Sequence, residues 1–181
     1  MAGQRFRVSR GFLEVEIKVN DHYSFTLLTA HLKSRRPIPE ADEADLRLEE
    51  AKVLREIIDG LLAAKPDVNL VVLGDLNDLH SSKPVKTILG GRGKKALVDT
   101  RPAERNGDTP PSSDRRLASR NVSWTHYYSV EDTYSRIDYI LLSKGIAKEW
   151  VPSESYVLSL PNWGLASDHR PLVASFFAEA K

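Results

Sequence analysis

Four short motifs carry residue types that could do chemistry, and each begins or follows a predicted strand. In chain order they are TAHLKS with His31, GDLND with Asp75 and Asn77, SRIDYILLS with Asp138, and SDHRPL with Asp168 and His169. Because open α/β sheets place ligands at the ends of their strands, these side chains could converge in space. Carboxylates, an amide and two histidines together indicate metal-assisted hydrolysis of a phosphoester.

The oxygen-bearing side chains of this set are candidate ligands for a divalent cation. Asp75 and Asp168 offer hard carboxylate oxygens, which suit Mg²⁺ or Mn²⁺. Asn77 could contribute to the metal site or orient a phosphate oxygen or the attacking water. An Asp-x-Asn sequence after a strand is more commonly a turn or helix cap, so this interpretation depends on the other motifs.

The two histidines are candidates for proton transfer and charge stabilisation. Asp138 lies within an apolar strand, where a buried carboxylate needs a cation or hydrogen bonds. If Asp138 holds the imidazole of His169, that histidine becomes a general base, and His31 could stabilise charge that develops on the phosphoryl group. A lone histidine such as His31 is more often a hydrogen-bonded structural residue, so its role also depends on the other motifs.

Hydrophobic periodicity predicts the elements that must position these motifs. Apolar residues alternate over 12–19, and a turn at 20–22 leads into the run 23–29, which together predict a β-hairpin. The nearly all-apolar run 69–74 predicts a strand that is buried on both faces. Also expected are strands near 96–99 and at 137–142, 155–160 and 172–177, a short helix over 83–89, and a polar surface loop over 101–121.

A long helix is predicted from the cap residue Asp42 to about Ala64, where a Lys-Pro pair ends it. Its apolar positions fall at helical spacing, so one face should pack on a sheet while the other faces solvent. Glu43 and Arg47 are expected to pair on the solvent face. Strands around one long helix predict an α/β layered fold, in a single domain over residues 1–181.

The composition excludes several classes of protein. The 181-residue chain has no cysteine, which rules out disulfide scaffolds, zinc–thiolate clusters and cysteine nucleophiles. Its 26 Lys and Arg residues nearly balance its 25 Asp and Glu residues, which disfavours a polybasic coat for nucleic acid but leaves a local basic groove open. No apolar stretch is long enough to span a membrane, and the first ten residues lack a signal-peptide core, so a soluble protein of unknown compartment is expected.

The four motifs, in this order, resemble the conserved blocks of the endonuclease/exonuclease/phosphatase superfamily, which includes DNase I-like nucleases, sphingomyelinases and inositol-polyphosphate phosphatases. The resemblance implies a DNase I-like α/β sandwich with an active site at the sheet edges. It also implies roles for six residues: His31 contacts phosphate, Asp75 lies beside the nucleophilic water, Asn77 orients phosphate or metal, Asp138 partners the catalytic histidine, Asp168 binds metal, and His169 acts on water or phosphate.

The sequence departs from the family pattern at its start. Family members usually begin with a strand that ends in asparagine, then a helix, then a strand that ends in a metal-binding glutamate, and this sequence starts after that segment. Glu14 and Glu16 lie in the wrong block to replace the glutamate and are expected to face solvent. The alternatives are a minimal enzyme whose weaker metal site uses Asp75 and Asp168, a homodimer whose partner covers exposed sheet, or an inactive fragment. The first two together are favoured.

Substrate choice in such enzymes depends on loops, which are the least predictable segments. Arg36 is a candidate phosphate contact. Trp163 could stack on substrate or pack in the core, and Trp124 is expected in the core. The sequence thus predicts a Mg²⁺- or Mn²⁺-dependent phosphodiesterase or phosphatase. The alternatives are a DNA endonuclease or exonuclease of the same superfamily, or a catalytically impaired phosphate-binding module.

Overall fold

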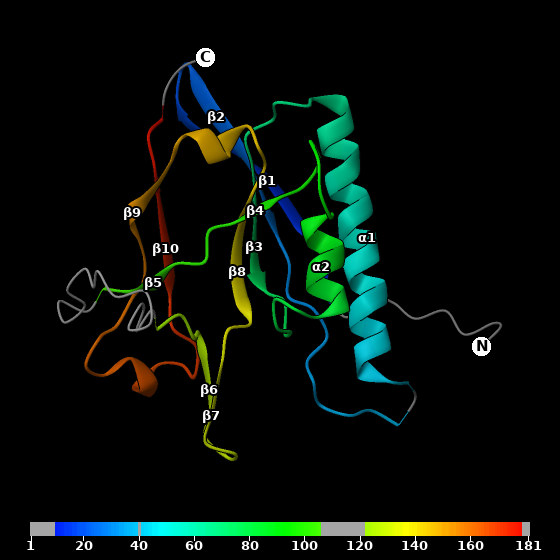
Figure 1. The fold of residues 1–181 in the computed structure, drawn as a ribbon, viewed down its shortest axis with the longest axis vertical. Coiled ribbons are helices and arrows are strands. Elements are labelled where there is room, and N and C mark those ends of the chain that lie inside the picture. Colours follow the sequence, from blue (N-terminus) through cyan, green and yellow to red (C-terminus); the bar gives the residue numbers. More distant parts are fainter. Residues whose placement is uncertain (1–9, 40, 106–121, 179–181) are drawn as a thin grey trace, which may run out of the picture.

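The computed structural model describes residues 10–39, 41–105 and 122–178. The helices are α1 (Glu43–Ala64) and α2 (Lys83–Leu89), with the short 3₁₀ turns η1 (Ile146–Lys148) and η2 (Trp163–Leu165). The strands are β1 (Leu13–Asn20), β2 (Tyr23–Thr29), β3 (Leu70–Asp75), β4 (Val98–Asp99), β5 (Ala103–Glu104), β6 (His126–Tyr128), β7 (Thr133–Ser135), β8 (Asp138–Leu142), β9 (Trp150–Val157) and β10 (Leu172–Phe176). Figure 1 shows their arrangement.

The larger sheet has the strand order β1-β2-β3-β8-β4. β1 and β2 form the predicted antiparallel hairpin, in which Leu13 lies opposite Thr29. β2 and β3 are parallel, and α1 connects them, whereas β8 lies antiparallel to both β3 and β4. The carboxyl ends of β2 and β3 and the amino end of β8 therefore meet at one end of the sheet.

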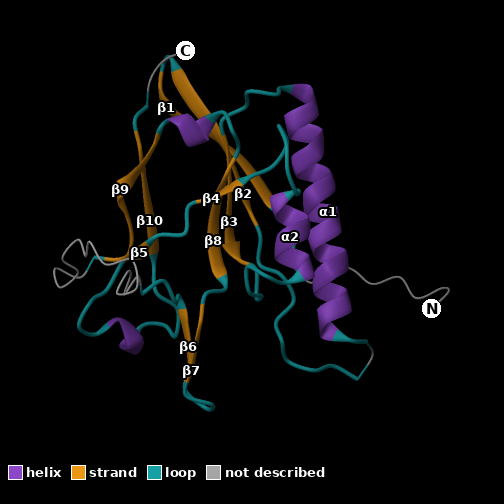
Figure 2. Cartoon of the chain, viewed as in Figure 1, coloured by secondary structure: helices purple, strands orange, loops and turns teal. Residues whose placement is uncertain are grey.

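Both α-helices cover one face of this sheet (Figure 2). Leu54 and Ile58 of α1 are fully buried in a core that also contains Leu28, Leu70 and other strand residues. Asp42 caps α1, because its carboxylate accepts hydrogen bonds from backbone amides of the first turn, as predicted. The helix layer thus holds the β2–β3 crossover in place.

A second sheet, with the strand order β10-β9-β5, lies on the other side of the larger sheet (Figure 1). Val71 of β3 and Ile140 of β8 belong to a core that also packs against Leu172 of β10. Because residues two apart in a strand share a face, Asp75 lies on the same face of β3 as Val71, and Asp138 lies on the same face of β8 as Ile140. Both carboxylates therefore point to the side of the larger sheet that faces away from the helices.

Most of the predicted elements are confirmed, including the first hairpin, both helices and the strands around 70–75 and 138–142. β9 begins at Trp150, earlier than the predicted start at 155. The β6–β7 hairpin was not predicted, since its strands have three residues each and no apolar alternation. The predicted loop over 101–121 contains the short β5, and its residues 106–121 lie outside the described part of the chain.

β1 lies at an edge of the larger sheet, and Glu14 and Glu16 are exposed on it, as expected. The homodimer expected from the sequence stays a prediction. Among the described helices, none has the length and apolar character needed to cross a membrane.

Candidate active site

Asp75 and Asp138 lie directly opposite each other, at the end of β3 and the start of β8. Burial raises the pKa of Asp75, and the neighbouring Asp138 carboxylate raises it further. The amide of Asn77 donates to Asp75 Oδ1 at 2.8 Å and offsets part of this effect. The strand pair therefore presents concentrated negative charge, which a cation would stabilise.

His169 is paired with Asp138, as expected from the sequence. Its Nδ1 lies 2.9 Å from Asp138 Oδ2, and its backbone amide donates to Ser167 Oγ at 3.0 Å. The hydrogen bond to Asp138 raises the pKa of His169 by more than burial lowers it. The other ring nitrogen, Nε2, lies 4.0 Å from Asp75 Oδ2, so the imidazole lies between the two carboxylates.

His31 approaches Asp75 from the end of β2, with 3.5 Å between Nε2 and Asp75 Oδ2. The amides of Ala30 and Leu32 donate to carbonyl oxygens of β3, both at 3.0 Å. Gly74 permits this contact, because its φ is +138° and a Cβ atom there would lie 1.9 Å from the Ala30 carbonyl oxygen. Burial lowers the pKa of His31, which favours the neutral imidazole.

Asn77 is fixed beside Asp75 by the backbone and by its own side chain. Its φ of 52° lies in the left-handed region, which asparagine tolerates better than most residues. Its Nδ2 donates to the Leu32 carbonyl oxygen at 3.0 Å. This bond sets the orientation of the carboxamide, whose oxygen is the ligand atom that Asn77 offers.

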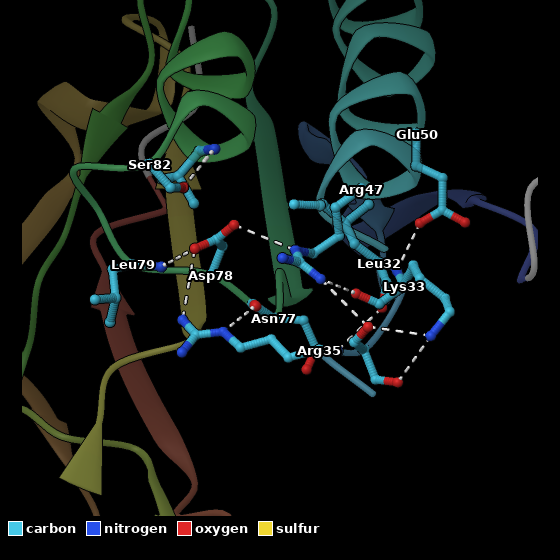
Figure 3. Close-up of polar contacts among 12 residues, drawn as sticks. Leu32, Lys33, Arg35, Arg47, Glu50, Asn77, Asp78, Leu79 and Ser82 are labelled. Atoms are coloured by element: carbon cyan, nitrogen blue, oxygen red, sulfur yellow. Dashed lines mark hydrogen bonds and ion pairs between the residues drawn. The ribbon is translucent and has the colours of Figure 1, made fainter. Parts of the chain in front are cut away.

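Asp78 anchors the loop that follows His31 (Figure 3). Arg35 Nη2 lies 3.5 Å from Asp78 Oδ1, and Arg35 Nε donates to the Asn77 carbonyl oxygen at 3.1 Å. Arg47 Nε lies 3.2 Å from the other carboxylate oxygen of Asp78. Arg35 from the loop after β2 and Arg47 from α1 thus both hold the GDLND turn.

The predicted pairing of Arg47 with Glu43 on the solvent face of α1 is wrong. The Arg47 side chain is only 4% exposed. Besides Asp78, it binds the carbonyl oxygens of Lys33 and Ser34, at 3.3 and 3.2 Å. A half-buried carboxylate with two backbone carbonyls satisfies the guanidinium better than one exposed glutamate, and only the folded loop supplies these partners.

Thr125 is a site-positioning residue that sequence reasoning missed. It is fully buried, and its Oγ1 accepts hydrogen bonds from the amides of Ile137 and Asp138, at 3.2 and 3.1 Å. Its carbonyl oxygen accepts from the Arg170 amide at 2.6 Å. Thr125 therefore joins the start of β8 to the segment that carries His169. A single threonine among aromatic residues gives no sequence signal for this role.

His126, also missed as a candidate ligand, contacts Asp168. The distance from His126 Nε2 to Asp168 Oδ2 is 3.5 Å, and the Asp168 side chain is 66% exposed. Two groups of described residues place one potential metal-ligand atom each within 4.8 Å of one another: Asp75, Asp138 and His169; and His126, Asp168 and His169. Asp75 and Asp168, both predicted as metal ligands, thus fall in different groups that share His169.

The two predicted substrate-binding residues lie outside this cluster of contacts. Arg36 is exposed, and its carbonyl oxygen accepts from Lys33 Nζ at 3.0 Å. Trp163 is half-buried, with its ring 5.4 Å from that of Trp124. The Arg170 guanidinium lies 4.1 Å from the Trp124 ring, so Trp124 packs between cationic and aromatic neighbours. Substrate contacts by Arg36 and Trp163 stay predictions.

The sequence matches the endonuclease/exonuclease/phosphatase family over residues 4–169. Beta toxin from Staphylococcus aureus superposes with a TM-score of 0.62 at 16% identity, over 92% of this chain and 57% of the toxin chain. Sphingomyelinase C from Streptomyces griseocarneus gives 0.58 at 18% identity, over 91% and 56%. The 3′ phosphatase NExo from Neisseria, bound to a product DNA hairpin, gives 0.56 at 15% identity, over 84% and 61%. Curated protein sequences give no significant match.

The structural likenesses confirm the expected DNase I-like α/β fold. The chain spans 56% to 61% of the length of these three structures. A mutant of the Staphylococcus aureus toxin has been solved with bound magnesium ions. Enzymes of the matched family hydrolyse phosphoesters. Because the match covers most of the sequence, the chain belongs to the endonuclease/exonuclease/phosphatase family.

Proposed function

We propose that this protein is a divalent-metal-dependent phosphoester hydrolase, acting as a phosphodiesterase or phosphatase. The observation that carries the proposal is the convergence of His31 and His169 on the carboxylate of Asp75. These three groups come from three separate motifs. Burying a carboxylate whose pKa rises lowers folding stability, so such an arrangement is typical of a functional site rather than a structural one.

His169 is the proposed general base. With Nδ1–H donating to Asp138, the neutral imidazole keeps Nε2 unprotonated. Nε2 faces Asp75, and a water between them would transfer a proton to this nitrogen as its oxygen attacks phosphorus. The bond from phosphorus to the ester oxygen then breaks, and that oxygen leaves with the bonding electron pair as the alcohol or phenol product. The Asp138 carboxylate then stabilises the imidazolium, consistent with the raised pKa of His169.

His31 and Asn77 bind and orient the phosphoryl group in this proposal. The neutral His31 imidazole carries one ring N–H, which can donate to a phosphoryl oxygen as negative charge develops there. The Asn77 carboxamide is held by its hydrogen bond to Leu32, so it loses little side-chain freedom when it orients a ligand.

A hard divalent cation such as Mg²⁺ or Mn²⁺ fits the oxygen atoms of Asp75 and Asn77. The fit rests on charge: Asp75 is half-buried beside Asp138, and among the described residues its ion-pair partners are two histidines and no lysine or arginine. When bound, the cation would polarise a phosphoryl oxygen and lower the pKa of water. The toxin structure with bound magnesium supports this choice of ion.

The test is hydrolysis of bis(p-nitrophenyl) phosphate and of p-nitrophenyl phosphate, each with Mg²⁺, Mn²⁺ or EDTA. We expect metal-dependent release of nitrophenol, and a loss of about 10²–10⁴-fold in the His169→Ala variant. His22→Ala is the matched control, because His22 is exposed in the turn at the other end of β2. The ratio of the two rates separates diesterase from phosphatase chemistry.

Contrary outcomes would identify the alternatives. Phosphate binding without turnover in any metal would favour an impaired phosphate-binding module. Efficient cleavage of DNA relative to the small diester would favour a nuclease, an option supported by the DNA product bound to NExo. Equal rates in wild type and His169→Ala would remove His169 from the mechanism.

A further inference from the structure

We propose that His126, Asp168 and His169 form a separate cation site that prefers transition metals such as Zn²⁺, and that its occupation inhibits the enzyme by withdrawing His169 from the reaction. Each residue offers one ligand atom, and these atoms lie within 4.8 Å of one another. The existence of the site depends on this geometry alone. The inhibitory effect rests on the proposed hydrolase function.

The separation of the first two ligands suits a small tetrahedral cation. His126 Nε2 and Asp168 Oδ2 are 3.5 Å apart. Zinc binds imidazole nitrogen and carboxylate oxygen at about 2.0–2.2 Å, so two of its tetrahedral ligands lie roughly 3.3–3.6 Å apart. The His126 and His169 ring centroids are 4.6 Å apart, so a second imidazole lies beside the first.

The backbone holds the three ligand residues on two adjacent segments, β6 with His126 and the residues before β10 with Asp168 and His169. His126 and His169 form an antiparallel β-bridge. On one side the Tyr127 amide donates to the Asp168 carbonyl oxygen at 3.0 Å, and on the other the Arg170 amide donates to the Thr125 carbonyl oxygen at 2.6 Å. The ligands are therefore pre-positioned on paired backbone rather than on free loops, which is what a metal site requires.

The donor set favours transition metals over magnesium. Two imidazoles and one carboxylate suit zinc, cobalt and nickel, whereas Mg²⁺ prefers oxygen ligands and retained water. His169 would use Nε2, because its Nδ1 is bonded to Asp138. A histidine ligand oriented by a carboxylate on its other nitrogen is the usual outer arrangement around protein-bound zinc. The exposed Asp168 side chain leaves the site accessible to an entering ion.

Inhibition follows from the shared nitrogen. The same Nε2 of His169 faces Asp75 and is the proposed proton acceptor. A lone pair that binds a metal ion cannot also accept a proton from water. A metal ion bound by His126, Asp168 and His169 would therefore stop the transfer of a proton from water to His169, although Asp75 is not one of its ligands.

The first experiment measures binding without turnover, using Zn²⁺ by calorimetry and Co²⁺ by its visible absorption, in buffer without Mg²⁺. We expect His126→Ala and Asp168→Asn to weaken binding by at least about 10-fold. Even the loss of a residue that only hydrogen-bonds to a zinc ligand lowers metal affinity by about that much. Asp75→Asn and the control His22→Ala should retain wild-type affinity. Unchanged affinity in His126→Ala and Asp168→Asn, or an equal loss in Asp75→Asn, would overturn the site. Asp168→Asn alters an exposed side chain, so it keeps the test valid if His126→Ala misfolds.

The second experiment titrates Zn²⁺ into the Mg²⁺-supported hydrolysis assay. Each protein is compared with its own zinc-free rate. We expect half-inhibition of His126→Ala to need at least about 10-fold more Zn²⁺ than wild type. Zinc that binds wild type but leaves its rate unchanged or raises it would overturn the inhibition. A wild-type protein with no turnover in any metal would instead overturn the proposed function, and the binding titration would still decide the site.

Discussion

Nδ1 of His169 and Oδ2 of Asp138 are 2.9 Å apart, although the two residues are 31 positions apart in the sequence. Asp138 begins β8 in the larger sheet, and His169 precedes β10 in the second sheet. The pair forms only if both sheets dock correctly. Its orientation directs Nε2 of His169 to Asp75, so this one contact links the architecture of the sandwich to the proposed chemistry.

Replacing Asp138 by asparagine should lower the pKa of His169. The hydrogen bond to the Asp138 carboxylate is the largest cause of the raised pKa, and a neutral amide cannot stabilise the imidazolium to the same extent. NMR titration of the histidine ring protons in metal-free protein measures this shift. In wild type, His169 should titrate at higher pH than His31, whose pKa burial lowers. An unchanged His169 titration in Asp138→Asn would show that the pair does not set its protonation.

Asp75→Asn should stabilise the metal-free protein above about pH 4. The pKa of Asp75 is raised above its ordinary value of 3.8 in the folded state. Ionisation of this carboxyl therefore lowers the stability of the folded protein as the pH rises from the unfolded-state pKa to the higher folded-state pKa. A gain of about 1 kcal/mol corresponds to a rise of about 2–4 °C in Tm for a chain of this size.

Thermal unfolding at several pH values, with and without Mg²⁺, measures the Asp75→Asn effect. The gain should vanish at low pH, where both proteins are neutral at this position. Added Mg²⁺ should raise the Tm of wild type more than that of the variant, because only wild type keeps the carboxylate ligand. A variant less stable than wild type at neutral pH would contradict the prediction.

Thr125→Val should destabilise the protein by at least about 2 kcal/mol, because a buried and a partly buried backbone amide lose their acceptor. Valine has nearly the same shape, so packing changes little. Urea unfolding measures the loss, and hydrolysis assays test whether Asp138 shifts as well. Thr125→Ser keeps the hydroxyl and should restore most of the stability. Equal losses in both variants would assign the effect to the methyl group instead.

Arg47→Met should cost roughly 2–4 kcal/mol, because it leaves Asp78 and two loop carbonyls without this guanidinium. Methionine retains much of the aliphatic volume, so the loss reports the polar contacts. Lys52→Met on the exposed face of the same helix is the control and should change stability by less than about 0.5 kcal/mol. Similar losses in the two variants would show that the Asp78 anchor contributes little.

The sequence was a sufficient guide wherever local chemistry sets the structure. The cap at Asp42 and the apolar periodicity of α1 placed that helix, and the alternation over 12–19 placed β1, because both signals act between neighbours in the chain. Short strands with polar residues lack such signals, so the β6–β7 hairpin, and with it the contact of His126 with Asp168, escaped prediction.

The four motifs could be recognised from the sequence, and with them the residue types of the site. Which of these residues share a contact was decided by the tertiary structure: Asp168 lies with His126 rather than in the ligand group of Asp75, and Arg47 turns inward to Asp78. The physical reason is that a side chain's partner depends on strand register and sheet docking, which bring together residues far apart in the chain. Local sequence determines the elements and their chemistry, whereas long-range packing determines which charges meet.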